Sequence, residues 1–273
     1  MTVCVSIKVH DCIVFAADSA STLVDAQGAV QNVFNNADKV FNLHRRLPIA
    51  AMTCGMGHIA GRSISNLAKE FRRDLMNGLD EENYQIADVV QAAHSFFDDK
   101  YSAILSERGH GFDFFISGYG SDAAHGEVWK ISIVAGTLQA AEQLQSGNDA
   151  GGINWGGQTS AIARLLLGVD PAIKSVLVDA GADPSVAEEV WNVARNGLLT
   201  GFAHNPMPTI DAIRLAEYLV DVTKGYFSFA SGANIVGGAT DIATVTRWEG
   251  FKWIKRKHFY PPELNRSQPD HVC

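Results

Sequence analysis

The sequence lacks a surplus of positive charge and any long uninterrupted apolar run. Its 30 Asp and Glu residues outnumber its 22 Lys and Arg residues, which gives a formal net charge of −8. Nucleic-acid binding, which relies on a basic surface, is therefore not expected. No charge-free stretch reaches the roughly 18 apolar residues of a membrane span, and the longest, 225–240, is broken by glycines and polar groups. We therefore expect neither a nucleic-acid partner nor a membrane partner.

Cysteine is also scarce. Cys4, Cys12, Cys54 and Cys273 form no C-x-x-C pair, so a zinc site or a disulfide scaffold is not expected. The nine histidines show no metal-ligand spacing such as H-E-x-x-H. We predict no metal and no cofactor. Met1 is followed at once by a strand-like pattern instead of the basic segment and apolar core of a signal peptide, so we expect a cytoplasmic protein.

The remaining composition is that of an ordinary globular chain. Hydrophobic residues make up 47% of the 273 residues and charged residues 19%, which excludes intrinsic disorder. No internal repeat, low-complexity run or linker divides the chain. We expect a single domain over residues 1–256 and an exposed C-terminal tail over residues 257–273.

Hydrophobic periodicity predicts strands, then two helices, then strands, helices and strands again. Strands are predicted at 2–9, 12–17, 39–43, 49–53, 114–117, 128–134, 242–246 and 251–255, and helices at 64–75, 86–104, 159–167, 171–181, 184–197 and 209–224. The polar stretches 19–36 and 145–158 are predicted to be loops. Segregated blocks of this kind favour a layered α+β fold over βαβ repeats.

The first predicted strand begins with a candidate nucleophile. If Met1 is removed, which the small side chain of Thr2 favours, Thr2 becomes the first residue of the chain. Its hydroxyl can then attack, and its own α-amine can take the proton. That amine titrates at roughly 7.7–8.0 and is partly unprotonated near neutral pH. The alternative interpretation is that Thr2 is only the first residue of a strand.

Three other residues fit the same site if the strands are neighbours in the fold. Asp18 ends the second predicted strand, Lys39 begins the third, and Gly55 follows the fourth. Asp18 can hold Lys39 charged and oriented, and the lysine can stabilise a developing alkoxide. The backbone N–H of Gly55 can donate to an oxyanion, and the absence of a side chain lets a substrate approach.

Motifs in a fixed order resemble proteasome β-subunits and their bacterial relatives, which are N-terminal nucleophile (Ntn) hydrolases. The matching segments are Thr2-Val-Cys-Val-Ser-Ile-Lys8, Val14-Phe-Ala-Ala-Asp-Ser19, Asp38-Lys39-Val40-Phe41, Met52-Thr-Cys-Gly-Met-Gly57, Gly157-Gln-Thr159 and Gly237-Gly-Ala-Thr-Asp-Ile242. The resemblance covers nearly the whole predicted domain. It implies a four-layer αββα sandwich whose members cleave peptide bonds and stack into rings.

Matched position by position, the resemblance implies Thr2 as the nucleophile, Asp18 and Lys39 as its charged pair, and Gly55 as the oxyanion donor. The implied partners are a peptide or unfolded-protein substrate and further copies of the chain in a homo-oligomeric ring or stacked rings; no ATPase partner is indicated. The positions implied to line the first substrate pocket are small and uncharged: Ser21, Ala37, Thr53, Gly57 and Gly61. They predict a roomy pocket for an apolar residue, or else small residues packing at a turn.

The chain also departs from the family pattern. Ala20 stands where the family usually has an arginine, and Gly156, Ala233 and Val236 stand where active members carry a serine, an aspartate and a serine. An alternative function is therefore a catalytically weak or inactive ring-forming scaffold on the same fold, and a third is a non-proteolytic amidase. Because Thr2, Asp18 and Lys39 are all retained, the sequence favours a threonine peptidase.

Overall fold

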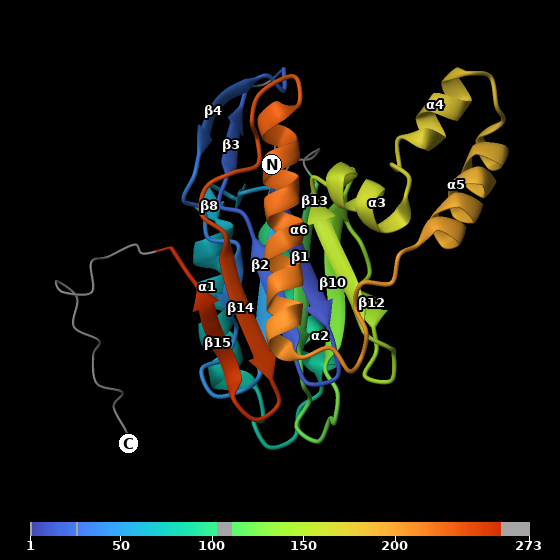
Figure 1. Cartoon of the computed structure of the whole chain (residues 1–273). Coiled ribbons are helices and arrows are strands. Elements are labelled where there is room, and N and C mark those ends of the chain that lie inside the picture. The colour runs from blue at the N-terminus through green and yellow to red at the C-terminus, as the bar shows by residue number, and fades with distance from the viewer. Residues whose placement is uncertain (1, 26, 103–110, 258–273) are drawn as a thin grey trace.

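The computed structural model describes residues 2–25, 27–102 and 111–257, and two β-sheets form its centre (Figure 1). The first sheet is antiparallel and has the strand order β13-β1-β2-β14-β15. Its strands are β1 (Val3–Lys8), β2 (Ile13–Ala17), β13 (Gly152–Gly157), β14 (Asp241–Thr246) and β15 (Gly250–Lys255). The predicted strands at 2–9 and 12–17 are thus confirmed, and they pair as a hairpin with Cys4 opposite Ala17.

The second sheet has the order β11-β10-β9-β6-β5, and β12 also pairs with β10. Its strands are β5 (Val40–Asn42), β6 (Ile49–Gly55), β9 (Phe112–Gly118), β10 (Glu127–Val134), β11 (Thr137–Leu138) and β12 (Glu142–Gln145). Two short hairpins stand apart from both sheets, β3 (Ser21–Val24) with β4 (Val30–Phe34) and β7 (His58–Ile59) with β8 (Arg62–Ser63).

Three apolar clusters hold the elements together. One packs α1 (Ile64–Gly78) and α2 (Ile86–Ser102) on the second sheet. Another packs α3 (Ser160–Leu167) and α6 (Thr209–Phe229) on the first sheet. The third joins side chains of both sheets, among them Phe15 of β2 and Phe115 of β9. The fold is therefore mixed α and β, as predicted. None of the helices among the described residues is long and apolar enough to cross a membrane.

Strand β1 is buried on both of its faces. Val3, Val5 and Ile7 lie in the cluster with α6, as the alternation predicts, and Cys4 lies in the cluster between the sheets. Lys8, at the end of the strand, is also buried, and its ammonium group donates to the backbone carbonyls of residues 146, 147 and 149. The first strand is thus fixed from end to end, which holds Thr2 at its start.

Two predicted loops are wrong. Residues 19–36 contain the hairpin β3–β4, and residues 145–158 contain β13, an edge strand of the first sheet. β13 has glycines at 152, 156 and 157 and only two apolar side chains, so hydrophobic alternation could not reveal it. Pairing with β1 supplies the order that the local pattern lacks.

The predicted C-terminal boundary also needs a correction. Lys257, the first residue assigned to the exposed tail, has a side chain that is only 6% exposed and forms ion pairs with Asp241 and Asp38. The rest of that tail, 258–273, lies outside the described residues, as does residue 104 at the end of the second predicted helix.

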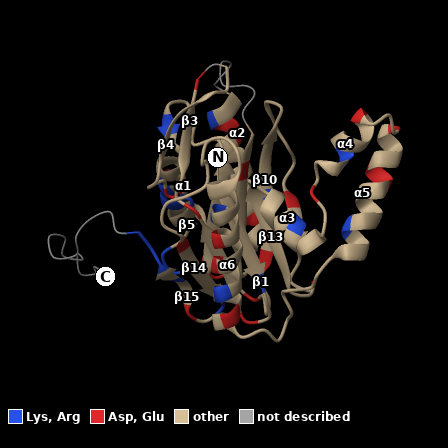
Figure 2. Cartoon of the chain, turned by 45° about the horizontal axis from the view of Figure 1, so that its top comes forward, with Lys and Arg blue, Asp and Glu red and all other residues tan. Residues whose placement is uncertain are grey.

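A helical hairpin of α4 (Ile173–Asp179) and α5 (Pro184–Leu198) extends from the body at the end of α3 (Figure 1). None of the residues of α4 is buried, and only Ala187 and Trp191 of α5 are. Figure 2 shows that both helices carry charges of both signs. The hairpin accounts for most of the long stretch between α3 and α6.

Candidate active site

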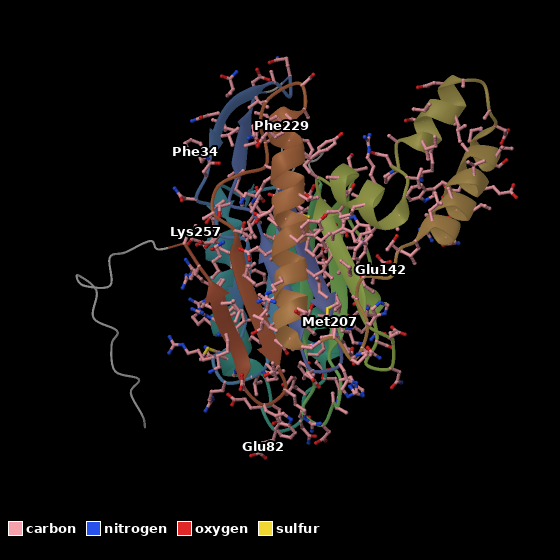
Figure 3. All side chains as sticks on the ribbon, viewed as in Figure 1. Phe34, Glu82, Glu142, Met207, Phe229 and Lys257 are labelled. Atoms are coloured by element: carbon pink, nitrogen blue, oxygen red, sulfur yellow. The ribbon has the colours of Figure 1, made fainter. Side chains whose placement is uncertain are left out.

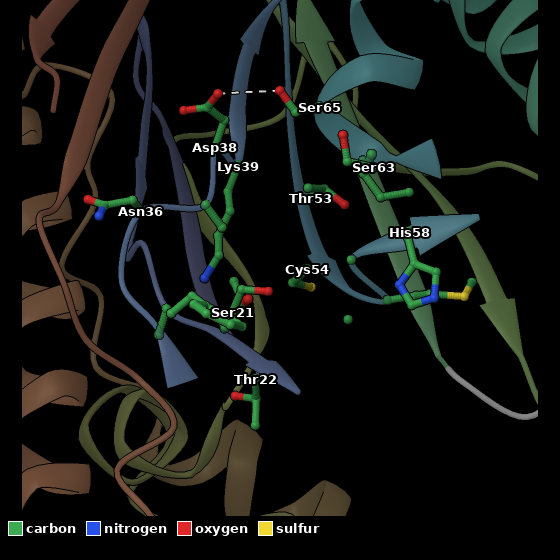
Figure 4. Close-up of a pocket in the computed structure, with 18 of the residues that line it drawn as sticks. Ser21, Thr22, Asn36, Asp38, Lys39, Thr53, Cys54, His58, Ser63 and Ser65 are labelled. Atoms are coloured by element: carbon green, nitrogen blue, oxygen red, sulfur yellow. Dashed lines mark hydrogen bonds between the residues drawn. The ribbon is translucent and has the colours of Figure 1, made fainter. Parts of the chain in front are cut away.

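A cavity of about 1300 Å³ opens where β1, β3 and β6 approach the start of α1. Thr2, Lys39, Thr53, Cys54 and Gly55 all line it. Figure 4 shows Lys39 with Ser21 and Thr22 nearby, and Asp38 hydrogen-bonded to Ser65 at its rim. The fold therefore brings together residues from five separate segments at one hollow.

The carboxylate of Asp18, beside this cavity, is fixed by hydrogen bonds from four donors. It is fully buried. One oxygen accepts from the backbone N–H of Val3 at 3.0 Å and from the Lys39 ammonium at 2.6 Å. The other accepts from the backbone N–H groups of Ala20 at 3.1 Å and Gly237 at 3.0 Å. A carboxylate with four donors is held in one orientation.

Lys39 is the partner of that carboxylate and is only 4% exposed. Burial lowers the pKa of the Lys39 ammonium, and the Asp18 carboxylate 2.6 Å away opposes that shift. The backbone carbonyl of Lys39 accepts from the backbone N–H of Thr53 at 2.9 Å, which ties Lys39 to β6. The pair is a desolvated cation and anion at the wall of a cavity, an arrangement typical of functional sites.

Thr2 shares the cavity wall with Lys39 and precedes Val3, which is hydrogen-bonded to Asp18. It is 5% exposed and lines the cavity. The next residue, Val3, donates its N–H to Asp18 and accepts at its carbonyl from the N–H of Asp18 at 3.2 Å. The carbonyl of Thr2 accepts from the N–H of Gln158 at 2.7 Å. Strand pairing on both sides thus holds Thr2 in place beside Asp18.

Gly55 is where β6 leaves the core and reaches the cavity. The six residues before it are buried, and Gly55 is exposed. Its φ of +89° is in the left-handed region, and a Cβ there would overlap the carbonyl of Gly111. Only glycine fits such a position without strain, so the backbone at 55 is open to a ligand in the cavity.

The five predicted pocket residues do not all meet. Ser21, Ala37, Thr53 and Gly57 line the cavity that Thr2 lines. Gly61 does not; it lies in the turn between β7 and β8, with open space where a side chain would be. The Thr53 hydroxyl donates to the carbonyl of Asp113 at 3.0 Å, so it is held by β9.

The departures from the family pattern have structural counterparts. Val236 is fully buried in the α6 cluster, whereas Ala233 is exposed, and neither lines the cavity. Ala20 is fully buried. At Gly156 a Cβ would lie 2.7 Å from the Cys54 sulfur and 3.1 Å from the ring of Phe115. The thiol of Cys54 therefore occupies the space into which a serine at 156 would point.

A serine at position 156 should therefore destabilise the fold unless Cys54 is made smaller. We expect Gly156→Ser to lower the free energy of unfolding by about 1–3 kcal/mol, the usual cost of overpacking. Gly156→Ser combined with Cys54→Ala should be more stable than the sum of the two single variants, by about 0.5 kcal/mol or more. Urea unfolding of the four proteins measures this, and strict additivity would contradict the proposed contact.

The thiol of Cys54 has low nucleophilicity at this position. The pKa of the Cys54 thiol is raised well above its usual value, mainly by a hydrogen bond with Cys4 and next by burial. The sulfur also lies 3.6 Å from a carboxylate oxygen of Asp113. A neutral thiol is a poor nucleophile, so Cys54 does not compete with Thr2 for that role.

Sequence reasoning missed several residues at the site. His58, Ser63 and Ser65 line the cavity from the hairpin β7–β8 and the start of α1. Lys257 also lines the cavity and forms a buried ion pair with Asp241. Lys257 belongs to the basic run 252–257, which has the composition of a solvated strand end, so no local signal distinguishes this lysine from its neighbours.

No group of three or more His, Cys, Asp or Glu residues within the described ranges is placed to hold a metal ion. The chain matches no protein-family model and no curated protein. Its structure is similar to that of a Gly-1 mutant of Anbu from Hyphomicrobium sp. strain MC1, with a TM-score of 0.52 and 14% identity over 94% of this chain and 86% of that one. This similarity shows a proteasome-like fold.

Proposed function

We propose that this protein is an N-terminal threonine hydrolase that cleaves peptide or other amide bonds after Met1 has been removed. The observation that carries the proposal is the buried Asp18–Lys39 pair, 2.6 Å apart, beside Thr2 at the wall of a large cavity. The proteasome-like fold supports it. Within the proposal, the two sheets and the helices that cover them are the four layers of an Ntn αββα sandwich.

The proposed reaction starts at the Thr2 hydroxyl. The free α-amine of Thr2 takes the hydroxyl proton while the oxygen bonds to the carbonyl carbon of the substrate. The Lys39 ammonium stabilises the developing alkoxide, and the N–H of Gly55 donates to the oxyanion. The amine then gives its proton to the leaving nitrogen as the amide bond breaks. Water, activated by the same amine, hydrolyses the ester and restores Thr2.

The cavity wall favours a particular class of substrate. Ser21, Ala37, Thr53 and Gly57 present small uncharged groups, which suit an apolar residue on the acyl side of the cleaved bond. We propose a peptide or unfolded protein as the substrate, no cofactor, a cytoplasmic location, and a homo-oligomeric ring or stacked rings as the assembly. Native mass measurement tests the assembly.

Cleavage of short capped peptides tests the reaction itself. The purified protein should release a fluorogenic amine from peptides that end in leucine or phenylalanine at least about tenfold faster than from matched peptides that end in aspartate or lysine, since Ser21, Ala37, Thr53 and Gly57 offer no opposite charge to a desolvated charged side chain. A threonine-directed boronate should block this activity. Equal rates for all four peptides would contradict the pocket assignment, and no cleavage of any of them would contradict the peptidase.

A second candidate function is an inactive ring-forming scaffold. It is favoured by Gly156, Ala233 and Val236, because none of these residues supplies a polar side chain to the cavity. A ring without any reaction at Thr2 would identify the scaffold. A monomer that hydrolyses small amides but no peptide would instead fit the non-proteolytic amidase.

A further inference from the structure

Lys257 lies just past the end of β15 (Figure 3), yet its side chain is buried. The side chain is 6% exposed. By contrast, Lys252 and Lys255 of β15 and the following Arg256 are all exposed. A lysine buried among exposed ones needs a compensating set of partners.

Those partners come from three segments that are distant in the sequence. The Lys257 ammonium is ion-paired with Asp241 and lies 3.4 Å from a carboxylate oxygen of Asp38. It donates to the Ser19 hydroxyl at 3.1 Å and to the carbonyl of Ala37 at 2.9 Å. Its backbone N–H also donates to Asp241, at 3.0 Å.

Each of these segments leads directly to the candidate active site. Ser19 follows Asp18, and Ala37 and Asp38 precede Lys39. Asp241 of β14 pairs with Ala17 of β2, and Ala17 is the residue that precedes Asp18. The segments are also joined to one another, because the N–H of Ala37 donates to the carbonyl of Ser19 at 2.9 Å. The Lys257 ammonium therefore contacts residues that neighbour both Asp18 and Lys39 in the sequence.

We propose that Lys257 is a positioning residue, which fixes the segments carrying Asp18 and Lys39 and offsets the charges of Asp38 and Asp241 beside them. This inference rests on the proposed function for its effect on reactivity, but its structural part stands independently. Without Lys257, Asp38 and Asp241 lose their shared counter-ion. The segments that carry Asp18 and Lys39 then lose the hydrogen bonds that Lys257 donates to Ser19 and Ala37. A small displacement of reacting groups costs up to about 10²-fold in rate.

Hydrogen–deuterium exchange tests the structural part. In Lys257→Met, the amides that donate to Asp18, those of Val3, Ala20 and Gly237, should exchange at least about tenfold faster, because their acceptor is less well held. Lys255→Met is the matched control: it removes a lysine of β15 that pairs with Glu217 at the surface, and it should leave these amides unchanged. Lys257→Arg should restore slow exchange. Should Lys257→Met not fold, Lys257→Met with Asp241→Asn removes both charges and keeps the test open.

The reactivity of Thr2 towards a β-lactone tests the functional part. Lys257→Met should label at least about tenfold more slowly than the wild type. The rise of its labelling rate with pH should occur at a higher pH than in the wild type, because the uncompensated carboxylates of Asp38 and Asp241 favour the protonated form of the Thr2 α-amine. Lys257→Arg should recover both. If the wild type does not label, the proposed function fails and the exchange rates alone decide the role of Lys257. Unchanged exchange in Lys257→Met overturns the positioning role, whatever the labelling shows.

Discussion

Replacing Thr2 with alanine is expected to lower the rate of amide cleavage by on the order of 10³-fold or more, since removing the nucleophile of a covalent mechanism leaves only binding and oxyanion contributions. Thr2→Ser keeps both the hydroxyl and the α-amine and should remain within about tenfold of the wild-type rate. The measurement is steady-state hydrolysis of a capped leucine peptide. The two variants differ in whether position 2 carries a hydroxyl.

A threonine elsewhere provides the control. Thr137 is exposed on β11, in the second sheet, and does not line the cavity, so Thr137→Ala should leave the rate unchanged. If Thr2→Ala keeps even a tenth of the wild-type activity, another residue is the nucleophile and the mechanism proposed above is wrong.

Changing Asp18 to asparagine is expected to lower the free energy of unfolding by about 3–5 kcal/mol, because it leaves the Lys39 ammonium buried without its counter-ion. An amide group also cannot accept all four of the hydrogen bonds that the carboxylate accepts, since one end of it is a donor. Urea unfolding measures the change. Cleavage should be lost as well, because Lys39 is no longer oriented.

Two further variants serve as controls for the effect of Asp18→Asn. Asp211 forms an exposed pair with Arg214 at 3.7 Å, and Asp211→Asn should cost less than about 1 kcal/mol. Asp18→Asn with Lys39→Met should be more stable than the sum of the single variants, because no unpaired charge remains. Additive losses would show that Asp18 and Lys39 do not act as a pair.

The sequence was most informative where apolar residues recur in a regular pattern or form a short run. The alternation of β1 and the run of β2 predicted both strands, and the stripes at 64–75 and 86–104 predicted α1 and α2. The positions of Thr2, Asp18, Lys39 and Gly55 could be predicted because each stands at the end of such a strand. Strand ends that meet at one edge of a layered fold place their side chains together.

Other features depend on contacts that no local pattern records. β13 is ordered by pairing with β1 and not by its own side chains. The buried position of Lys257 depends on Asp241, Asp38 and Ser19, the last of which lies 238 residues away. Gly61 was expected in the pocket because the family resemblance implied it, but it lies in the turn between β7 and β8 and does not line the cavity. Long-range electrostatics and turn geometry are decided by the assembled fold.

The proposed mechanism requires Thr2 to be a nucleophile with a free α-amine. Intact-mass measurement of the purified protein, before and after treatment with a threonine-directed β-lactone, tests this requirement. We expect a mass that lacks the initiating methionine, the addition of one label per chain, localisation of that label to Thr2 by peptide mapping, and no label on Thr2→Ala. Retention of Met1, or labelling that persists in Thr2→Ala, would show that Thr2 is not the nucleophile.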